Sequence, residues 1–257
     1  MLGGIYMKYE KVLLERENKV IYKDGEKVIK VFDNTFSKSA ILKEALNLSL
    51  AEEAGLNVPE LCEITEKDGK FSMVYRFIEG TPLSELLSTH PSKEEDYLNL
   101  FVDTQIGILS RKAPNGFVKI KDKMNERISQ TRNLIEATVR YELHSSVSKM
   151  KDHTKICHGD FVPENIIVTP DNQVYVLDWA HATQGNASAD AAKTYINLNL
   201  QNKKEFADKY IKLFCKKSDI PLQLVQQWLP IVAAAEMAAS DDEKTEKLKK
   251  WVKTFDY

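Results

Sequence analysis

The 257 residues include 36 lysines and arginines against 38 aspartates and glutamates, so the formal net charge is -2. The 43% hydrophobic content is enough to build a sizeable core. Acidic and basic residues are interleaved, so the chain lacks the basic stripe that neutralises nucleic-acid phosphates, and we expect no nucleic-acid partner. No apolar run approaches the roughly 20 residues needed to span a bilayer, so we also expect no membrane insertion.

The three cysteines, Cys62, Cys157 and Cys215, are widely spaced and contain no Cys-x-x-Cys pair. This pattern predicts neither a disulfide framework nor a zinc site, and it favours a reducing compartment. Residues 1–7 lack the apolar region of a secretory signal. We therefore expect a cytoplasmic protein that is a monomer or a weak dimer.

The first third of the chain predicts strands and one helix. Strands at 20–22 and 28–32 flank Asp24-Gly25, a dipeptide that two-residue hairpin turns favour. A helix is expected from about Ser37 to Gly55, because apolar residues recur at helical spacing and the glycine is placed as a stop.

A second pair of strands is predicted at 60–65 and 71–77, after which Gly80 and its neighbours break the pattern. This break is the best hinge candidate in the chain, and it predicts two lobes, at 1–78 and 79–257. The second lobe should be mostly helical, with long periodic stretches at 94–112, 123–150, 188–200, 203–215 and 222–239.

A short hairpin is predicted inside the helical lobe, with strands at 166–168 and 174–177. Asp160 and Asn165 precede its first strand, and Asp178 ends its second. A hairpin folds its two ends together, so these three side chains should converge at one rim. Carboxylates and amides are hard oxygen ligands suited to Mg²⁺, and crowding them is costly unless a cation lies among them. The hairpin therefore predicts a metal site and a phosphate ligand.

The spacing from His158 to Asp160 and on to Asn165 is H-x-D-x-x-x-x-N, and Asp178 follows thirteen residues later. This pattern resembles the catalytic loop and metal-binding aspartate of the protein-kinase-like superfamily. The tripeptide His-Gly-Asp in place of His-Arg-Asp, and Asp-Trp in place of Asp-Phe-Gly, are similar to the aminoglycoside phosphotransferase branch. That branch includes antibiotic, choline, homoserine and methylthioribose kinases, and the resemblance covers most of the chain.

The resemblance implies a bilobal α+β fold, with a small β-rich N-lobe carrying one helix, a larger mostly α C-lobe, and an active site between them. It implies ATP and Mg²⁺ as cofactors. Asp160 would accept or orient the proton of the substrate hydroxyl, Asn165 and Asp178 would hold the magnesium ions, and His158 would brace the loop. The alternative is that Asp160 caps a turn and the other two are ordinary strand-end polar residues.

Lys30 and Glu44 lie on apolar faces of their strand and helix, where either charge would be costly unpaired, so they are a natural pair. By the resemblance, Lys30 contacts the α- and β-phosphates of ATP and Glu44 positions it. The alternative is that Lys30 reaches solvent and Lys27 takes the role. By the same analogy the carbonyl of Arg76 and the amide of Ile78 face the adenine, with a register uncertain by one or two residues.

Two features leave alternatives open. Residues 14–19, at the position of the glycine-rich loop of protein kinases, contain no glycine, which restricts close backbone approach to phosphate and keeps a catalytically inactive kinase-like binding protein in view. Asp190 either braces the catalytic loop, as the family analogy implies, or is, like Ser188, a candidate for the residue that caps the following helix.

The expected reaction is ATP-dependent phosphorylation of a hydroxyl on a small molecule, with an aminoglycoside as one candidate acceptor. Choline, a sugar, homoserine or a protein are alternative acceptors. An aminoglycoside would need an acidic pocket, and Glu236 is the most informative candidate because its surroundings are apolar. The alternative is that the Glu236 side chain simply reaches the protein surface. The remaining candidates, read mostly as solvated helix faces, are Asp103, Glu142, Glu205, Asp208 and the run 241–243.

Overall fold

A computed structural model describes residues 9–16, 18–67 and 69–252; residues 1–8, Glu17, Asp68 and 253–257 lie outside it. The chain divides into two compact units, Met1–Thr81 with Ile167–Ala180, and Pro82–Ile166 with His181–Tyr257. The lobe boundary after residue 78 stays a prediction. The central hairpin is grouped with the N-terminal unit.

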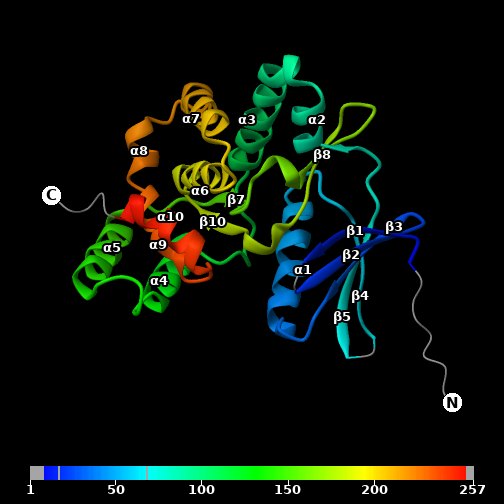
Figure 1. Cartoon of the computed structure of the whole chain (residues 1–257), viewed down its shortest axis with the longest axis horizontal. Coiled ribbons are helices and arrows are strands. Elements are labelled where there is room, and N and C mark those ends of the chain that lie inside the picture. The colour runs from blue at the N-terminus through cyan, green and yellow to red at the C-terminus, as the bar shows by residue number, and fades with distance from the viewer. Residues whose placement is uncertain (1–8, 17, 68, 253–257) are drawn as a thin grey trace. The chain divides into compact units, whose positions relative to one another are not determined.

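One antiparallel sheet forms the N-terminal unit, with the strand order β1-β2-β3-β5-β4 among the described residues (Figure 1). Its strands are β1 (Lys11–Arg16), β2 (Lys19–Asp24), β3 (Lys27–Phe32), β4 (Leu61–Lys67) and β5 (Lys70–Arg76). Both predicted strand pairs are confirmed. The turn between β2 and β3 consists of Gly25 and Glu26, one residue later than predicted, and Gly25 has the positive φ of 57°.

Helix α1 (Lys38–Glu53) packs on this sheet, as predicted. The Ser37 side chain caps it by accepting the Ala40 N–H at 3.2 Å, and Gly55, with φ 75°, follows its end. The core between helix and sheet consists of Phe32, Ile41, Ala45 and Met73.

The predicted central hairpin is confirmed as β8 (Ile166–Val168) and β9 (Val174–Val176), and β6 (Thr81–Pro82) extends it in the order β6-β8-β9. Gly80 passes so close to β8 that a Cβ atom there would lie 2.6 Å from Ile167 Cγ2 and 2.7 Å from the Val168 carbonyl. The close approach of the chain at residue 80 to β8 therefore requires glycine, and this is the glycine of the predicted hinge.

The second unit is mostly helical, as predicted. Its helices and strands are α2 (Leu83–Thr89), η1 (Pro91–Lys93), α3 (Glu94–Ser110), α4 (Ile120–Gln130), α5 (Ala137–Lys149), β7 (Lys155–Cys157), η2 (Pro163–Asn165), β10 (Thr183–Gly185), α6 (Ala187–Leu200), α7 (Lys204–Ser218), α8 (Leu222–Gln226), α9 (Leu229–Met237) and α10 (Asp242–Val252). The first unit also contains the start of the short helix η3 (Trp179–His181).

Two predicted helices are wrong in extent. The stretch 123–150 is two helices: the Thr131 hydroxyl donates to the Ile128 carbonyl at 2.7 Å where α4 ends, and Ile135 is buried between the helices in sequence. The stretch 222–239 is likewise divided into α8 and α9. Helix α9 is buried on nearly all sides and packs against α4, α6 and α10.

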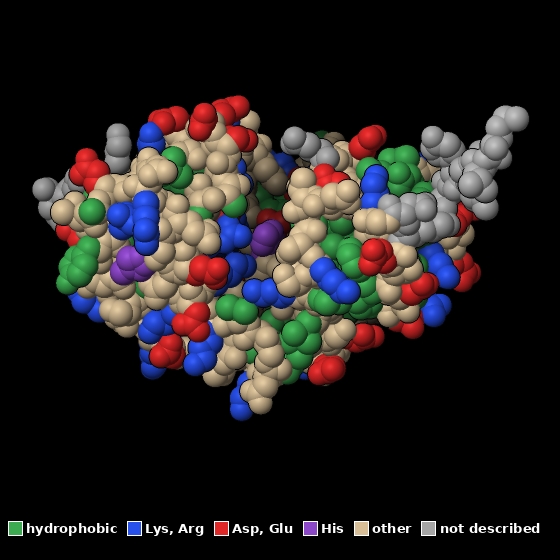
Figure 2. Space-filling model, turned by 90° about the horizontal axis from the view of Figure 1, so that it is seen from below, with side chains coloured by type: hydrophobic (Ala, Val, Ile, Leu, Met, Phe, Trp, Pro, Cys, Tyr) green, Lys and Arg blue, Asp and Glu red, His purple; other side chains and the backbone are tan. Residues whose placement is uncertain are grey.

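On the face shown in Figure 2, acidic and basic side chains are intermixed, in keeping with the nearly balanced composition. Within residues 9–252, as far as they are described, no helix combines the length and the apolar character needed to cross a membrane.

Candidate functional site

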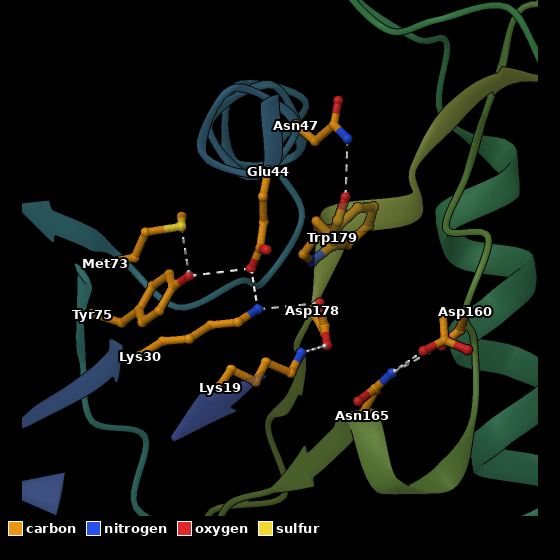
Figure 3. Close-up of polar contacts among 10 residues, drawn as sticks. All are labelled: Lys19, Lys30, Glu44, Asn47, Met73, Tyr75, Asp160, Asn165, Asp178 and Trp179. Atoms are coloured by element: carbon orange, nitrogen blue, oxygen red, sulfur yellow. Dashed lines mark hydrogen bonds and ion pairs between the residues drawn. The ribbon is translucent and has the colours of Figure 1, made fainter. Parts of the chain in front are cut away.

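Lys30 and Glu44 form a buried ion pair in the first unit, as the sequence predicts. β3 carries Lys30 opposite Met73 of β5, and α1 presents Glu44 to it (Figure 3). The two residues are only 4% and 6% exposed, whereas Lys27 is exposed at the turn end of the same strand. The alternative, in which Lys30 reaches solvent and Lys27 takes its role, is thus not supported.

Asp178 joins this pair from the end of the central hairpin. Its φ of 59° lies in the left-handed region, which aspartate tolerates better than most residues but at a conformational cost. One carboxylate oxygen lies 3.6 Å from Lys30 Nζ, and the other lies 3.4 Å from Lys19 Nζ (Figure 3). Two lysines therefore converge on one carboxylate.

The two lysines respond differently to this environment. Burial by itself lowers the pKa of Lys30, but Asp178 and Glu44 outweigh it and the pKa is raised. Burial lowers the pKa of Lys19, and the neighbouring Lys30 charge lowers it further, against the attraction of Asp178. Lys19 thus has less carboxylate compensation than Lys30, and a further anion beside it would be favourable.

Two contacts support the cluster from behind. The Tyr75 hydroxyl lies 3.4 Å from Glu44 Oε1, as donor, and burial followed by the Glu44 charge raises its pKa well above the ordinary value. The Asn47 amide donates to the Trp179 carbonyl at 3.1 Å, one residue after Asp178. Asn47 is one helical turn from Glu44. Helix α1 therefore contacts both Lys30, through Glu44, and the end of the β8–β9 hairpin, through Asn47.

Arg76 and Ile78, predicted to face adenine, are not brought to this cluster by any contact among the described residues. The Arg76 side chain is exposed and pairs with Glu60 at 2.7 Å, and its backbone N–H donates to the Glu60 carbonyl at 3.0 Å. Ile78 is half-buried. Their predicted role uses backbone atoms, and it stays a prediction.

The second unit holds Asp160 and Asn165 together. The Asn165 amide nitrogen donates to the Asp160 carbonyl at 2.9 Å and to its carboxylate at 3.3 Å. In Figure 3 the Asn165 amide oxygen points away from Asp160. Asn197 on α6 donates to the other carboxylate oxygen of Asp160 at 2.8 Å. Two amides thus hold the carboxylate in one orientation.

The loop before Asp160 requires glycine. Gly159 has φ +78°, and a Cβ atom there would lie 2.4 Å from the carbonyl oxygen of His181. This contact explains His-Gly-Asp at 158–160. The buried ring of His158 accepts the Asp160 N–H at 3.2 Å through Nδ1, so it braces the loop as expected.

Asp190 is the brace of this loop. It is 2% exposed, and its carboxylate accepts the Gly159 N–H at 2.7 Å and the Gln105 amide at 3.0 Å. Gln105 in turn accepts the Tyr210 hydroxyl at 2.5 Å. The cap of α6 is Asn186, whose side chain accepts the Ser188 N–H at 2.9 Å. The brace interpretation is confirmed, and the interpretation of Ser188 or Asp190 as the cap is wrong.

Sequence reasoning missed Lys19, Asn47, Gln105 and Asn197. A signal existed for Asn197, which lies two helical turns after Asp190 and so on the same face of α6. Asn47 could likewise have been found from its spacing to Glu44. Lys19 belongs to segment 14–19, where the absence of glycine drew attention away from the charge of this lysine.

The candidate acceptor carboxylates do not form an acidic pocket through any contact described. Glu236 is half-buried and ion-paired with Lys193, so it is not a lone carboxylate, and its role as an acceptor-site residue stays a prediction. Asp208 is paired with Lys204, and Asp103 is paired with Lys217. Glu142, Glu205 and the run 241–243 are exposed.

We predict a pH-dependent contribution of Glu236 to stability. Burial raises its pKa, but Lys193 and then Arg127 outweigh burial and lower the pKa from 4.5 to about 2. A carboxylate with a depressed folded-state pKa stabilises the protein above pH 4.5 and loses this effect as the pH falls towards 2, by about 3 kcal/mol in all. Urea unfolding should show Glu236→Gln to be less stable than wild type near pH 7, with the gap reduced by about 2 kcal/mol near pH 3. A gap that does not change with pH would contradict this assignment.

The donors at the two predicted metal ligands fit Mg²⁺. Asp178 offers a carboxylate whose lysine contacts are long, and Asn165 offers an amide oxygen while its nitrogen is engaged by Asp160. Both are hard oxygen donors. In the part of the chain that is described, no three His, Cys, Asp or Glu side chains gather as a metal-binding group. That the two residues together hold a magnesium ion stays a prediction.

Known proteins were compared with the chain. The model of the phosphotransferase enzyme family matches residues 13–222, and no curated protein matches. A thermostable mutant of aminoglycoside phosphotransferase APH(4)-Ia, in apo form, is similar in structure with a TM-score of 0.70 and 15% identity, over 95% of this chain and 92% of that one. Choline kinase LicA from Streptococcus pneumoniae has a TM-score of 0.61 and 17% identity over 95% of each chain.

Other structures of APH(4)-Ia mutants are ternary complexes of hygromycin B with ADP or AMP-PNP. At such low identities the structural likeness shows the fold, and the predicted α+β kinase-like fold is confirmed. The family match spans most of the chain, and the protein therefore belongs to the phosphotransferase enzyme family.

Proposed function

We propose that this protein transfers the γ-phosphate of ATP, with Mg²⁺, to a hydroxyl group of a small molecule. The observation that carries the proposal is the convergence of Lys19 and Lys30 on Asp178 in the first unit. The family assignment supports phosphotransfer, and the nucleotides bound to APH(4)-Ia support ATP as the donor.

A polyphosphate fits this cluster because Lys19 and Lys30 supply positive charge and Asp178 supplies a carboxylate of the kind that binds metal ions. Two ammonium groups close together repel one another, and burial increases that cost. Phosphate oxygens beside Lys19 and Lys30 would compensate both charges. Asp178 would then exchange its long lysine contacts for a cation.

We propose that Asp178 and Asn165 hold magnesium, which when bound supplies neutralisation of charge on the phosphates. Lys30, fixed by Glu44, would contact the α- and β-phosphates. The carbonyl of Arg76 and the amide of Ile78 would bond to the adenine edge, as the resemblance implies.

Asp160 is proposed as the residue that accepts or orients the proton of the attacking hydroxyl. Its carboxylate is oriented by the amides of Asn165 and Asn197, and its backbone by His158. A general base needs such fixed geometry, because proton transfer depends on hydrogen-bond reach to the substrate.

The acceptor is proposed to be a small hydroxylated compound. Hygromycin B bound to APH(4)-Ia makes an aminoglycoside one candidate, and the similarity to choline kinases makes choline another. The lysine pairing of Glu236, Asp208 and Asp103 favours acceptors that do not require several free carboxylates.

The test is release of ADP from Mg²⁺-ATP by the purified full chain with a panel of aminoglycosides, choline, homoserine, sugars and nucleosides. We expect turnover above the acceptor-free rate with at least one compound. Absence of both turnover and Mg²⁺-ATP binding would refute the kinase proposal. Binding of Mg²⁺-ATP without turnover on any compound would instead support the inactive binding protein.

We also propose that Lys19 supplies by its side chain part of the phosphate contact that a glycine-rich loop makes through its backbone. Lys19→Met keeps the apolar stem and removes the charge, and should weaken ATP binding by about tenfold, the loss of about 1.4 kcal/mol. Calorimetric titration of ATP measures this. Lys11→Met, on the exposed neighbouring strand β1, is the matched control and should bind ATP as wild type does. Equal affinity of Lys19→Met and wild type would exclude Lys19 from the phosphate site.

A further inference from the structure

A cavity of about 700 Å³ lies within the second unit. It is formed by the end of α3, the segment 149–155, the first turn of α6, the end of α7, and α8. The cavity is separate from Asp160, because none of the side chains that bond to Asp160 lines it. Its volume is that of a typical small-molecule site.

The inner wall of the cavity is apolar. Leu109, Phe214 and Trp228 form buried parts of it, with exposed fractions of 4%, 0% and 1%. Ile106 is half-buried, and Leu224 on α8 is 45% exposed at the wall. The three buried side chains leave almost no surface for a ligand to cover, so an apolar group in the cavity would gain its free energy mainly by covering Ile106 and Leu224.

The charged residues around the cavity are all basic. Lys149 and Lys151 are exposed and Lys155 is half-buried, and Lys217 lies across from them on α7. No aspartate or glutamate is among the lining residues, all of which the structure describes. His153 also lines the cavity, and its pKa is lowered, first by burial and then by Lys151 and Lys155.

Three carboxylates lie close in sequence to lining residues. Asp152 is paired with Lys121 at 3.3 Å, Asp103 is paired with Lys217 at 2.8 Å, and Asp219 is exposed between the lining residues Ser218 and Ile220. No ion pair with a described residue engages Lys149, Lys151 or Lys155, so their charges can meet a ligand. An anionic group would gain charge-assisted hydrogen bonds from them, and a cationic group would be repelled.

We infer that this cavity binds a small amphiphilic anion, whose apolar body covers Ile106 and Leu224 and whose carboxylate meets the lysines at 149, 151 and 155. The ligand class is a medium-chain carboxylate free in solution. A neutral ligand of the same length would lose the charged contacts, and a cationic one would meet the lysines as like charges.

Calorimetric titration of the full chain tests this with decanoate, decanol and decyltrimethylammonium below their aggregation concentrations. We expect saturable binding of decanoate, about tenfold or more tighter than decanol, and no binding of the cation. Absence of decanoate binding, or equal affinity for anion and cation, would overturn the inference.

Two matched pairs of variants locate the site. Lys149→Glu with Lys151→Glu should weaken decanoate binding by about tenfold or more, whereas Lys216→Glu, exposed on α7 and outside the lining, should not. Leu224→Asp should also weaken it, whereas Leu222→Asp on the same helix, 38% exposed and outside the lining, should not. All five positions are exposed, so the variants should melt as wild type does. Unchanged decanoate affinity in both cavity variants would place the binding elsewhere and overturn the inference.

Discussion

Replacing Asp160 with alanine should lower kcat for phosphate transfer by about 10³-fold and leave ATP affinity within about twofold of wild type. The carboxylate is proposed to act on the acceptor hydroxyl, and the contacts described for it, to Asn165 and Asn197, orient it rather than bind nucleotide. Alanine is the sharper change, because the oxygen of an asparagine there would still accept from one of the two amides while its NH2 group would face the N–H donors of the other.

The measurement is steady-state ADP release with the acceptor identified from the panel, with ATP affinity followed by calorimetry. Glu164→Ala is the control, because Glu164 lies in the same loop but is ion-paired with Lys203 near the surface at 2.5 Å. We expect it to keep nearly full kcat. Full activity of the Asp160→Ala protein would show that another group handles the hydroxyl proton.

Asp178→Asn should weaken binding of Mg²⁺-ATP by about 100-fold, the loss of about 2.7 kcal/mol, and leave binding of metal-free ATP unchanged or tighter. Asparagine accepts the left-handed φ of 59° at this position, so the change removes charge without adding backbone strain. The substitution removes a carboxylate with two proposed effects. It binds the metal ion, and it competes with phosphate for Lys19 and Lys30.

Calorimetric titrations of ATP with and without Mg²⁺ separate these two effects. Asp171→Asn is the control, since Asp171 lies in the exposed turn of the same hairpin and bonds to Thr169. Equal loss of affinity with and without Mg²⁺ would contradict a metal role for Asp178 and indicate a purely structural one.

The parts of the fold predicted from sequence are those with strong local signals. The helix α1 has a serine cap, apolar spacing and a terminal glycine, and the central hairpin has two apolar strands around a polar turn. The Lys30–Glu44 pair was predictable because each charge lies in an apolar pattern and a buried charge must find a partner.

The parts that were missed lack such signals. Strand β1 is exposed along its whole length, and consecutive apolar residues such as Val12, Leu13 and Leu14 show no alternation to reveal it. The break between α4 and α5 lies beside Thr131, whose hydroxyl bonds to the Ile128 carbonyl, and the hydrophobic pattern does not mark it.

Several contacts among the candidate site residues join positions that are far apart in sequence. Lys19 meets Asp178 across 159 positions, and Gln105 meets Asp190 across 85. No local periodicity encodes such pairs. The motif residues Asp160 and Asn165 were found because they lie five residues apart, whereas Asn197, which completes the carboxylate's surroundings, lies on a helix that only the fold brings to it.

The most direct test of phosphotransfer is phosphorus NMR of the full chain with Mg²⁺-ATP and the pooled acceptor panel, beside an Asp160→Ala sample. We predict that the γ-phosphate resonance of ATP decays in the wild-type sample as a phosphomonoester resonance appears, and that the Asp160→Ala sample stays nearly unchanged. An unchanged γ-phosphate resonance in the wild-type sample, or inorganic phosphate as its sole product, would contradict transfer to a small-molecule hydroxyl.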